Sequence, residues 1–197
     1  TDYRMIQRKA GDISQLRSQM YGVELSYGNV VALLFAGIEA NYFSNYANLM
    51  YNTHFDGSLS EIEAINIPNR NSGYSVRGNV SKRFDVIATT VNLAGGYMQS
   101  WSDLLRESVI MPSQYSLITA ELGFNTRITK AVRVDYKAMY NRSMSTIAND
   151  TPPAINLLKQ SADIDFIIAQ MVICRIGAEH FLNSAIEGGS RTTIFVD

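Results

Sequence analysis

The chain has two histidines, and neither is placed to act as a catalytic base. Ser184 follows His180 by four residues, so both side chains lie on one side of an extended strand but about 13 Å apart along it. A hydroxyl needs its base within hydrogen-bonding reach. His54 stands close to Asp56 in a polar stretch that predicts a loop. The sequence therefore predicts a protein that is not an enzyme.

Carboxylate pairs are the next candidates for chemistry. Asp163 and Asp165 share one face of a predicted strand, and Glu61 and Glu63 stand two apart in a predicted loop, a spacing that could hold calcium. Solvated charge is the simpler interpretation, so no metal site is predicted. Gly95-Gly96 lacks the strand–loop–helix setting of a phosphate cradle, and no cofactor is expected.

Composition narrows the class of protein. The 197 residues carry 17 Lys and Arg against 18 Asp and Glu, which removes the basic footprint of a nucleic-acid-binding domain. Charged residues make up 18%, below the roughly 25% of ordinary soluble domains. A single cysteine excludes an intrachain disulfide framework. No run of about 18 apolar residues predicts a transmembrane helix. A transmembrane β-barrel accounts for the mixture, because alternate residues face lipid and water.

Alternation with a period of two supports this interpretation. In the stretch 131–143, Val132, Val134 and Tyr136 fall on one face, and Arg133 and Asp135 on the other. Successive side chains of a strand point to opposite faces. A membrane-spanning strand needs about 9–11 residues, and this segment is long enough.

About eight or nine segments show this pattern. The connections between them alternate. Tight turns are expected near Tyr27–Val30, Lys82–Asp85, Ile128–Ala131 and Ala169–Val172, and long polar loops at 46–72, 102–115, 144–160 and 184–190. Short turns on one side and long loops on the other are typical of an outer-membrane barrel. A β-sandwich is the competing interpretation, but its strands are shorter and its loops alternate less regularly.

Two residue sets follow from this reading. The residues expected to face the lumen are Glu24, Glu39, Arg77, Glu121, Arg127, Arg133, Asp135, Lys137, Asp163 and Arg175. Tyrosine and tryptophan gather at membrane–water interfaces. An aromatic girdle toward the loop side is expected at Tyr42, Tyr46, Tyr97, Trp101, Tyr136 and Tyr140.

The last part of the chain carries a family resemblance, in the segments Gly177–Ser184, Gly188–Arg191 and Thr193–Asp197. They resemble the late barrel of Bacteroidetes TonB-dependent receptors, and more narrowly the outer membrane β-barrel family that often follows a carboxypeptidase-like regulatory domain. Leu182 and Val196 depart from the family pattern. Earlier segments that resemble this family are Ala40–Tyr51, Asn71–Tyr74, Val80–Asp85 and Pro152–Ile155.

The resemblance implies an antiparallel transmembrane β-barrel segment, residues 1–197 being a partial barrel of a larger, 22-stranded type without plug or regulatory domain. It implies the barrel wall of a bacterial outer-membrane transporter that imports a bulky nutrient such as a glycan, peptide or metal chelate. Expected partners are membrane lipid, the remaining strands and plug of the parent, TonB acting through that plug, and a surface lipoprotein. Two alternatives stay open: an accessory barrel subunit of an envelope assembly, and a soluble all-β binding module.

Overall fold

The computed structural model describes the chain apart from residues 1–3, 9–13, 57–58, 170–171, 187 and 197. Twelve strands and one short 3-10 turn, Asp85–Ile87, make up the described elements. Within the described residues, no helix has the length and apolar character to cross a membrane.

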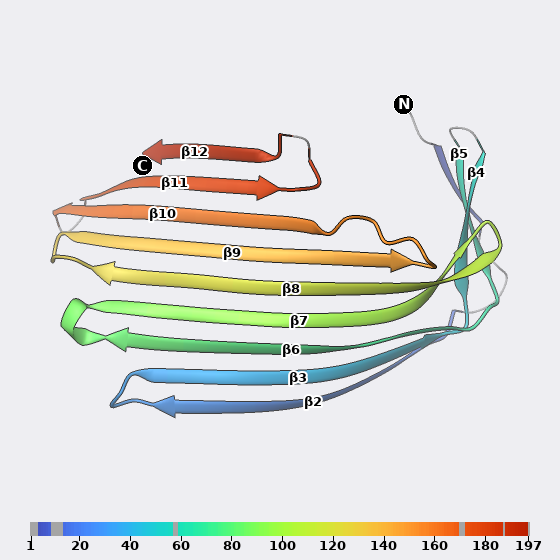
Figure 1. Cartoon of the computed structure of the whole chain (residues 1–197), viewed down its shortest axis with the longest axis horizontal. Helices are drawn as coiled ribbons and strands as arrows, with labels where there is room; N and C mark the ends of the chain where they lie inside the picture. Colours follow the sequence, from blue (N-terminus) through green and yellow to red (C-terminus); the bar gives the residue numbers. More distant parts are fainter. Residues whose placement is uncertain (1–3, 9–13, 57–58, 170–171, 187, 197) are drawn as a thin grey trace.

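The main body is one antiparallel sheet in which each strand pairs with the next along the wall (Figure 1). Its strands, in spatial order, are β2 (Leu16–Asn29), β3 (Leu34–Ala47), β6 (Asn69–Phe84), β7 (Thr89–Arg106), β8 (Val109–Arg127), β9 (Val132–Ile147), β10 (Ile155–Ala169), β11 (Val172–Asn183) and β12 (Ser190–Val196). The expected eight or nine alternating segments correspond to these nine strands of the described chain.

The remaining strands lie at one end of the sheet. β4 (Met50–Asp56) and β5 (Leu59–Ile65) form a hairpin, β1 (Arg4–Arg8) pairs with β5 in parallel, and β4 makes a short parallel contact with β7. The long loop expected at 46–72 is therefore wrong in part, because it contains this hairpin and the start of β6. Leu49, Met50, Ala64 and Leu105 are buried there.

The expected tight turns are found, except that the one at Ala169–Val172 lies partly outside the described residues, but not every connection at the other end of the sheet is a long loop. Short turns at 30–33, 85–88 and 128–131 gather at one end of the sheet, on the left of Figure 1, opposite the β4–β5 hairpin. The loop expected at 102–115 is wrong, because β7 and β8 continue through it as paired strands and meet at Glu107 and Ser108. The loops at 148–154 and 184–189 are shorter than expected because the flanking strands continue into them.

The β7–β8 turn offers a stability test. Glu107 and Ser108 have φ values of 50° and 62°, a conformation that a tight hairpin requires and that asparagine and glycine adopt more easily. Replacing Glu107-Ser108 by Asn-Gly should stabilise the hairpin by about 0.5–1 kcal/mol. Hydrogen exchange of the amides in 102–113 should slow accordingly. Exchange that is unchanged or faster would contradict this reading of the turn.

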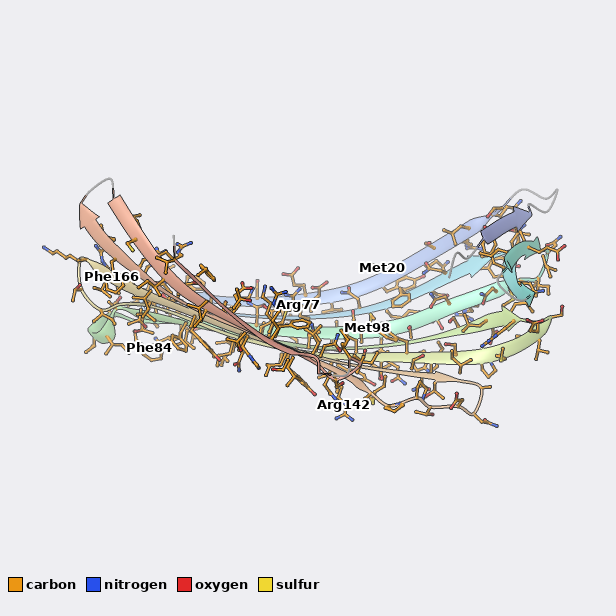
Figure 2. The ribbon with its side chains drawn as sticks, turned by 90° about the horizontal axis from the view of Figure 1, so that it is seen from above. Met20, Arg77, Phe84, Met98, Arg142 and Phe166 are labelled. Atoms are coloured by element: carbon orange, nitrogen blue, oxygen red, sulfur yellow. The ribbon has the colours of Figure 1, made fainter. Side chains whose placement is uncertain are left out.

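The sheet is a single layer, and apart from Leu105, which lies beside the β4–β5 hairpin, no described hydrophobic side chain of the nine wall strands is buried. Leu25 is 66% exposed, Ile38 50% and Leu93 52%, although all three lie within paired strands. The sheet bows, and Figure 2 shows Met20, Arg77 and Met98 along its concave side and Phe84 and Arg142 on the other. A β-sandwich would need a facing sheet, so the described residues do not form one.

Candidate functional site: the two faces of the sheet

The register assigns every side chain of the wall to one of two faces, because directly paired residues point the same way. One row crosses eight strands without a charge: Leu25, Ile38, Gly78, Gly95, Ala120, Tyr140, Leu158 and Leu182. We call the face that contains this row the apolar face. The next row, on the other side, contains Glu24, Glu39 and Arg77. We call that side the polar face.

The apolar face carries a band of uncharged residues about as long as a membrane-spanning strand requires. On β9 the band runs from Val132 to Tyr140 at every second residue, and on β8 from Ile118 to Phe124. Charged side chains occur only at its borders on the described wall strands: Arg17, Arg70, Lys82, Asp103 and Arg142.

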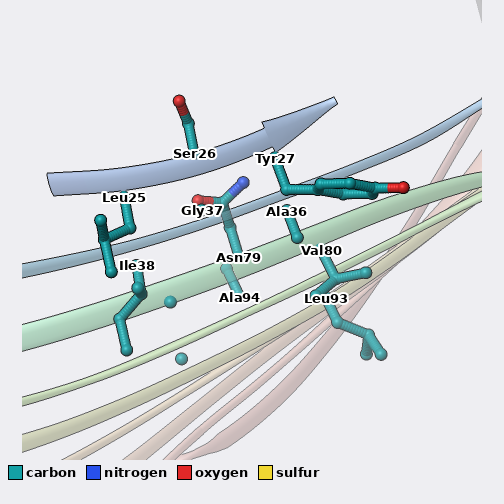
Figure 3. Close-up of a pocket in the computed structure, with 12 residues that line it drawn as sticks. Leu25, Ser26, Tyr27, Ala36, Gly37, Ile38, Asn79, Val80, Leu93 and Ala94 are labelled. Carbon is teal, nitrogen blue, oxygen red and sulfur yellow. The ribbon is translucent and has the colours of Figure 1, made fainter. Parts of the chain in front are cut away.

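The band contains a shallow depression of about 450 Å³ across β2, β3, β6 and β7. It lies over Gly78 and Gly95, which have no side chains to fill it. Figure 3 shows Leu25, Ile38 and Leu93 pointing to one side of the ribbons, while Ser26 points to the other. The depression is therefore a feature of the apolar face.

The polar face holds all ten residues predicted to face the lumen, and the structure separates nine of them into three groups. The first group is Glu24, Glu39 and Arg77, which are successive partners on β2, β3 and β6. Two carboxylates thus stand directly opposite each other, an arrangement that destabilises a strand pair. Asn41 donates a hydrogen bond to Glu39.

The second group is an ion-pair network across β9, β10 and β11, close to the tight turns. Asp165 accepts hydrogen bonds from Arg133 at 2.8 Å and from Arg175 at 2.7 Å, and Arg133 also contacts Asp135 at 2.9 Å. The Asp165 side chain is only 6% exposed, whereas the two arginines are 45% and 46% exposed. Asn125 donates a hydrogen bond to Asp135. Asp165 lies on the same face as the predicted lumen residues but is not one of them, because the sequence does not show that it pairs with Arg133 and Arg175.

The third group lines a hollow of about 470 Å³ on the polar face between β7 and β10. Glu121, Lys137 and Asp163 face it, together with Asp135 and Asn125. One carboxylate oxygen of Asp163 is buried and has no hydrogen-bond partner among the described residues. Arg127, near the end of β8, donates instead to the backbone carbonyls of Thr129 and Lys130. The ten residues are therefore a charged lining and not a single catalytic site.

The predicted aromatic residues lie on the apolar face, and most lie toward the end of the long loops. Tyr74 joins this set, with its ring centroid 5.9 Å from Tyr97 and 5.8 Å from Trp101. Tyr74 and Tyr97 both donate hydrogen bonds to Gln99, at 2.8 and 3.0 Å. Tyr140 donates to Asn156 at 2.8 Å. That these residues form an interfacial girdle stays a prediction.

Tyr42 and Tyr46 occupy the loop end of β3, as expected, but Tyr136 does not lie at the loop end of its strand. It is the fifth residue of β9 from the tight-turn end and stacks on Phe124 with ring centroids 4.9 Å apart. The expectation of a loop-side position for Tyr136 is therefore wrong. Four-residue spacing fixes the face of a strand but not the height along it.

The other sequence candidates are not brought together as a site. His180 shares a hydrogen bond with Thr192 at 3.0 Å, and Ser184 accepts one from the backbone of Asn156 at 2.8 Å. The side chains of His54, Asp56 and Glu61 lie outside the described part. Within the described part, no three His, Cys, Asp or Glu side chains gather as a metal site would require.

Comparison with known proteins shows which folds this two-faced sheet resembles. No family model and no curated protein matches the sequence. Among solved structures, the ferric yersiniabactin uptake receptor FyuA from Yersinia pestis matches with a TM-score of 0.58 at 14% identity, over 92% of this chain and 33% of the receptor. The ferric preacinetobactin receptor BauA from Acinetobacter baumannii matches with a TM-score of 0.56 at 9% identity, over 93% of this chain and 36% of the receptor.

The fold is that of an outer-membrane β-barrel wall. The prediction of an all-β, antiparallel barrel segment is confirmed, and the expected bacterial outer-membrane location agrees with these neighbours. The chain spans about a third of the length of the two receptors. At this level of identity the likeness establishes the fold alone. The barrel wall explains why an uncharged face is exposed on one side of a single-layer sheet.

Proposed function

We propose that the chain is a non-enzymatic part of the barrel wall of a TonB-dependent outer-membrane transporter. The distribution of charge carries this proposal: the apolar face of the described wall strands has charged residues only at its borders, while the concave polar face has opposed carboxylates on β2 and β3 and an ion-pair network on β9, β10 and β11. A wall that separates lipid from a polar interior needs this asymmetry. The two receptor folds add support.

The finer points of the proposal rest on the family resemblance. The transporter imports a bulky nutrient such as a glycan, peptide or metal chelate, and belongs to a Bacteroidetes-type receptor with a plug and a surface lipoprotein. Among the described strands, β2 pairs only with β3 and β12 only with β11, so each leaves one open edge. Open sheet edges are not tolerated in lipid, so further strands complete the wall. The polar face then surrounds a plug on which TonB acts.

Growth on a candidate nutrient tests the transport role. Cells that lack the gene should lose high-affinity uptake, and cells that lack TonB should lose it to the same extent. An accessory barrel subunit predicts uptake that persists without TonB. Two simpler observations come before this test. The protein should require detergent for extraction, and it should migrate differently on gels with and without heating, as folded barrels do. A monodisperse monomer in plain buffer would contradict the barrel itself.

Topology gives a further testable prediction. The tight turns should lie on the periplasmic side and the β7–β8 turn outside. Starting from a Cys174→Ala background, single cysteines are placed at Val86, Lys130 and Ser108. A membrane-impermeant maleimide added to intact cells should label Ser108→Cys and neither of the others. Labelling of Val86→Cys but not Lys130→Cys would contradict the strand alternation.

A further inference from the structure

The outward surface just beyond the aromatic residues is polar and cationic on the β2–β3–β6 side of the sheet. Arg17, Tyr46 and Arg70 are successive partners on these strands, so all three side chains emerge on the apolar face at one level. Neighbouring strands are about 4.8 Å apart, which puts the two arginine backbones about 10 Å apart with one tyrosine between them. The other charged side chains on this face of the described wall strands are Lys82, Asp103 and Arg142, which also lie at the borders of the uncharged band.

Arg70 is held in position by its neighbours. Its Nε donates to the Ser44 hydroxyl at 3.1 Å, and one terminal nitrogen donates to the Tyr42 hydroxyl at 3.4 Å. A guanidinium has five N–H donors, so further donors remain for a ligand. Arg17 and Arg70 border a groove of about 750 Å³ that Gln19, Ser44 and Tyr46 also line. Within the described residues, no carboxylate forms an ion pair with either arginine.

The surroundings identify the type of ligand. The groove lies on the long-loop side of Tyr21 and Tyr42, which are paired at the edge of the uncharged band. Farther down the same strands is the apolar depression over Gly78 and Gly95. A ligand that lies along this surface contacts cations and hydroxyls near the long loops and an apolar surface farther along the strands. Such a ligand is amphipathic and anionic.

We propose that Arg17 and Arg70 bind the phosphate groups of lipopolysaccharide in the outer leaflet, with its sugars in the groove and its acyl chains along the apolar face. Arginine binds phosphate in a bidentate manner and is suited to this recognition. The site rests on the proposed barrel wall but not on transport. Asp103 is the one negative charge on this face of the described wall strands, and it lines, with Arg70, an adjacent groove of about 490 Å³.

The test measures binding of bisphosphorylated lipid A to the detergent-purified barrel that contains this wall. R17Q and R70Q should each raise the Kd about five-fold, and the double variant about 25-fold, as expected for one basic residue each at an anionic lipid surface. R17K with R70K should retain most of the binding. The matched control is R83Q, which removes an arginine of β6 from the polar face at the tight-turn end.

Three further measurements separate the sources of binding. Dephosphorylated lipid A should bind the wild type as weakly as bisphosphorylated lipid A binds the double variant, and inorganic phosphate should not compete at millimolar concentration. D103N should tighten binding two- to five-fold. Equal Kd values for wild type and double variant, or effective competition by phosphate alone, would overturn the lipid site. A wild type that does not partition into detergent would instead overturn the barrel proposal.

Discussion

Replacing Leu122 with arginine should destabilise the barrel by about 2–4 kcal/mol. Leu122 lies near the middle of the uncharged band, paired with Leu93 and Ala138, and is 38% exposed on the apolar face. Its surroundings in the proposed barrel are hydrocarbon, so an arginine there loses its hydration. Denaturant unfolding of the barrel in lipid vesicles measures the change in the free energy of unfolding.

The control is the adjacent residue of the same strand. Glu121 lies on the polar face and no ion pair of its carboxylate is found among the described residues, so E121R introduces the same side chain into a water- or protein-facing setting. Its effect should stay within about 0.5 kcal/mol. A larger loss for E121R than for L122R would mean that the two faces are assigned the wrong way round.

Replacing Asp165 with asparagine should cost about 2–3 kcal/mol, because it removes the shared anion of Arg133 and Arg175. Hydrogen bonds to charged groups contribute about 1.5–3 kcal/mol each. We place the expected loss within that range for the pair together, since both arginines are nearly half exposed and regain water. The same unfolding measurement applies.

Asp85→Asn is the matched comparison for Asp165→Asn. The Arg83–Asp85 ion pair has a similar length, 2.9 Å, but its side chains are 56% and 69% exposed. Exposed pairs contribute little, and D85N should change stability by about 0.5 kcal/mol or less. Equal effects of the two substitutions would show that burial of Asp165 does not matter to the network.

Alternation made the wall predictable from sequence. In β9, Val132, Val134 and Tyr136 alternate with Arg133 and Asp135, and the strand follows directly from that pattern. The same rule places each predicted lumen residue on the face where the register puts it. A period of two residues predicts the face on which a side chain lies but not its position along the strand. The prediction is therefore correct for the faces and wrong for the position of Tyr136 along β9.

The extension of β7 and β8 was not predictable in this way. Leu104 and Leu105 are adjacent apolar residues, and the turn uses Glu107 and Ser108 in place of the usual glycine or asparagine. Pairing between the two strands overrides these weak local signals. The Asp165 network was likewise hidden, since it depends on which residues of three strands meet.

The long β7–β8 hairpin has a consequence for recognition at the cell surface. Its strands have 18 and 19 residues, about 60 Å of extended chain, of which a bilayer needs only about half. In the proposed topology, the remainder of the hairpin stands outside the membrane as an ordered surface. A phage tail or an antibody that binds this surface finds it already ordered. Binding there therefore costs little conformational entropy.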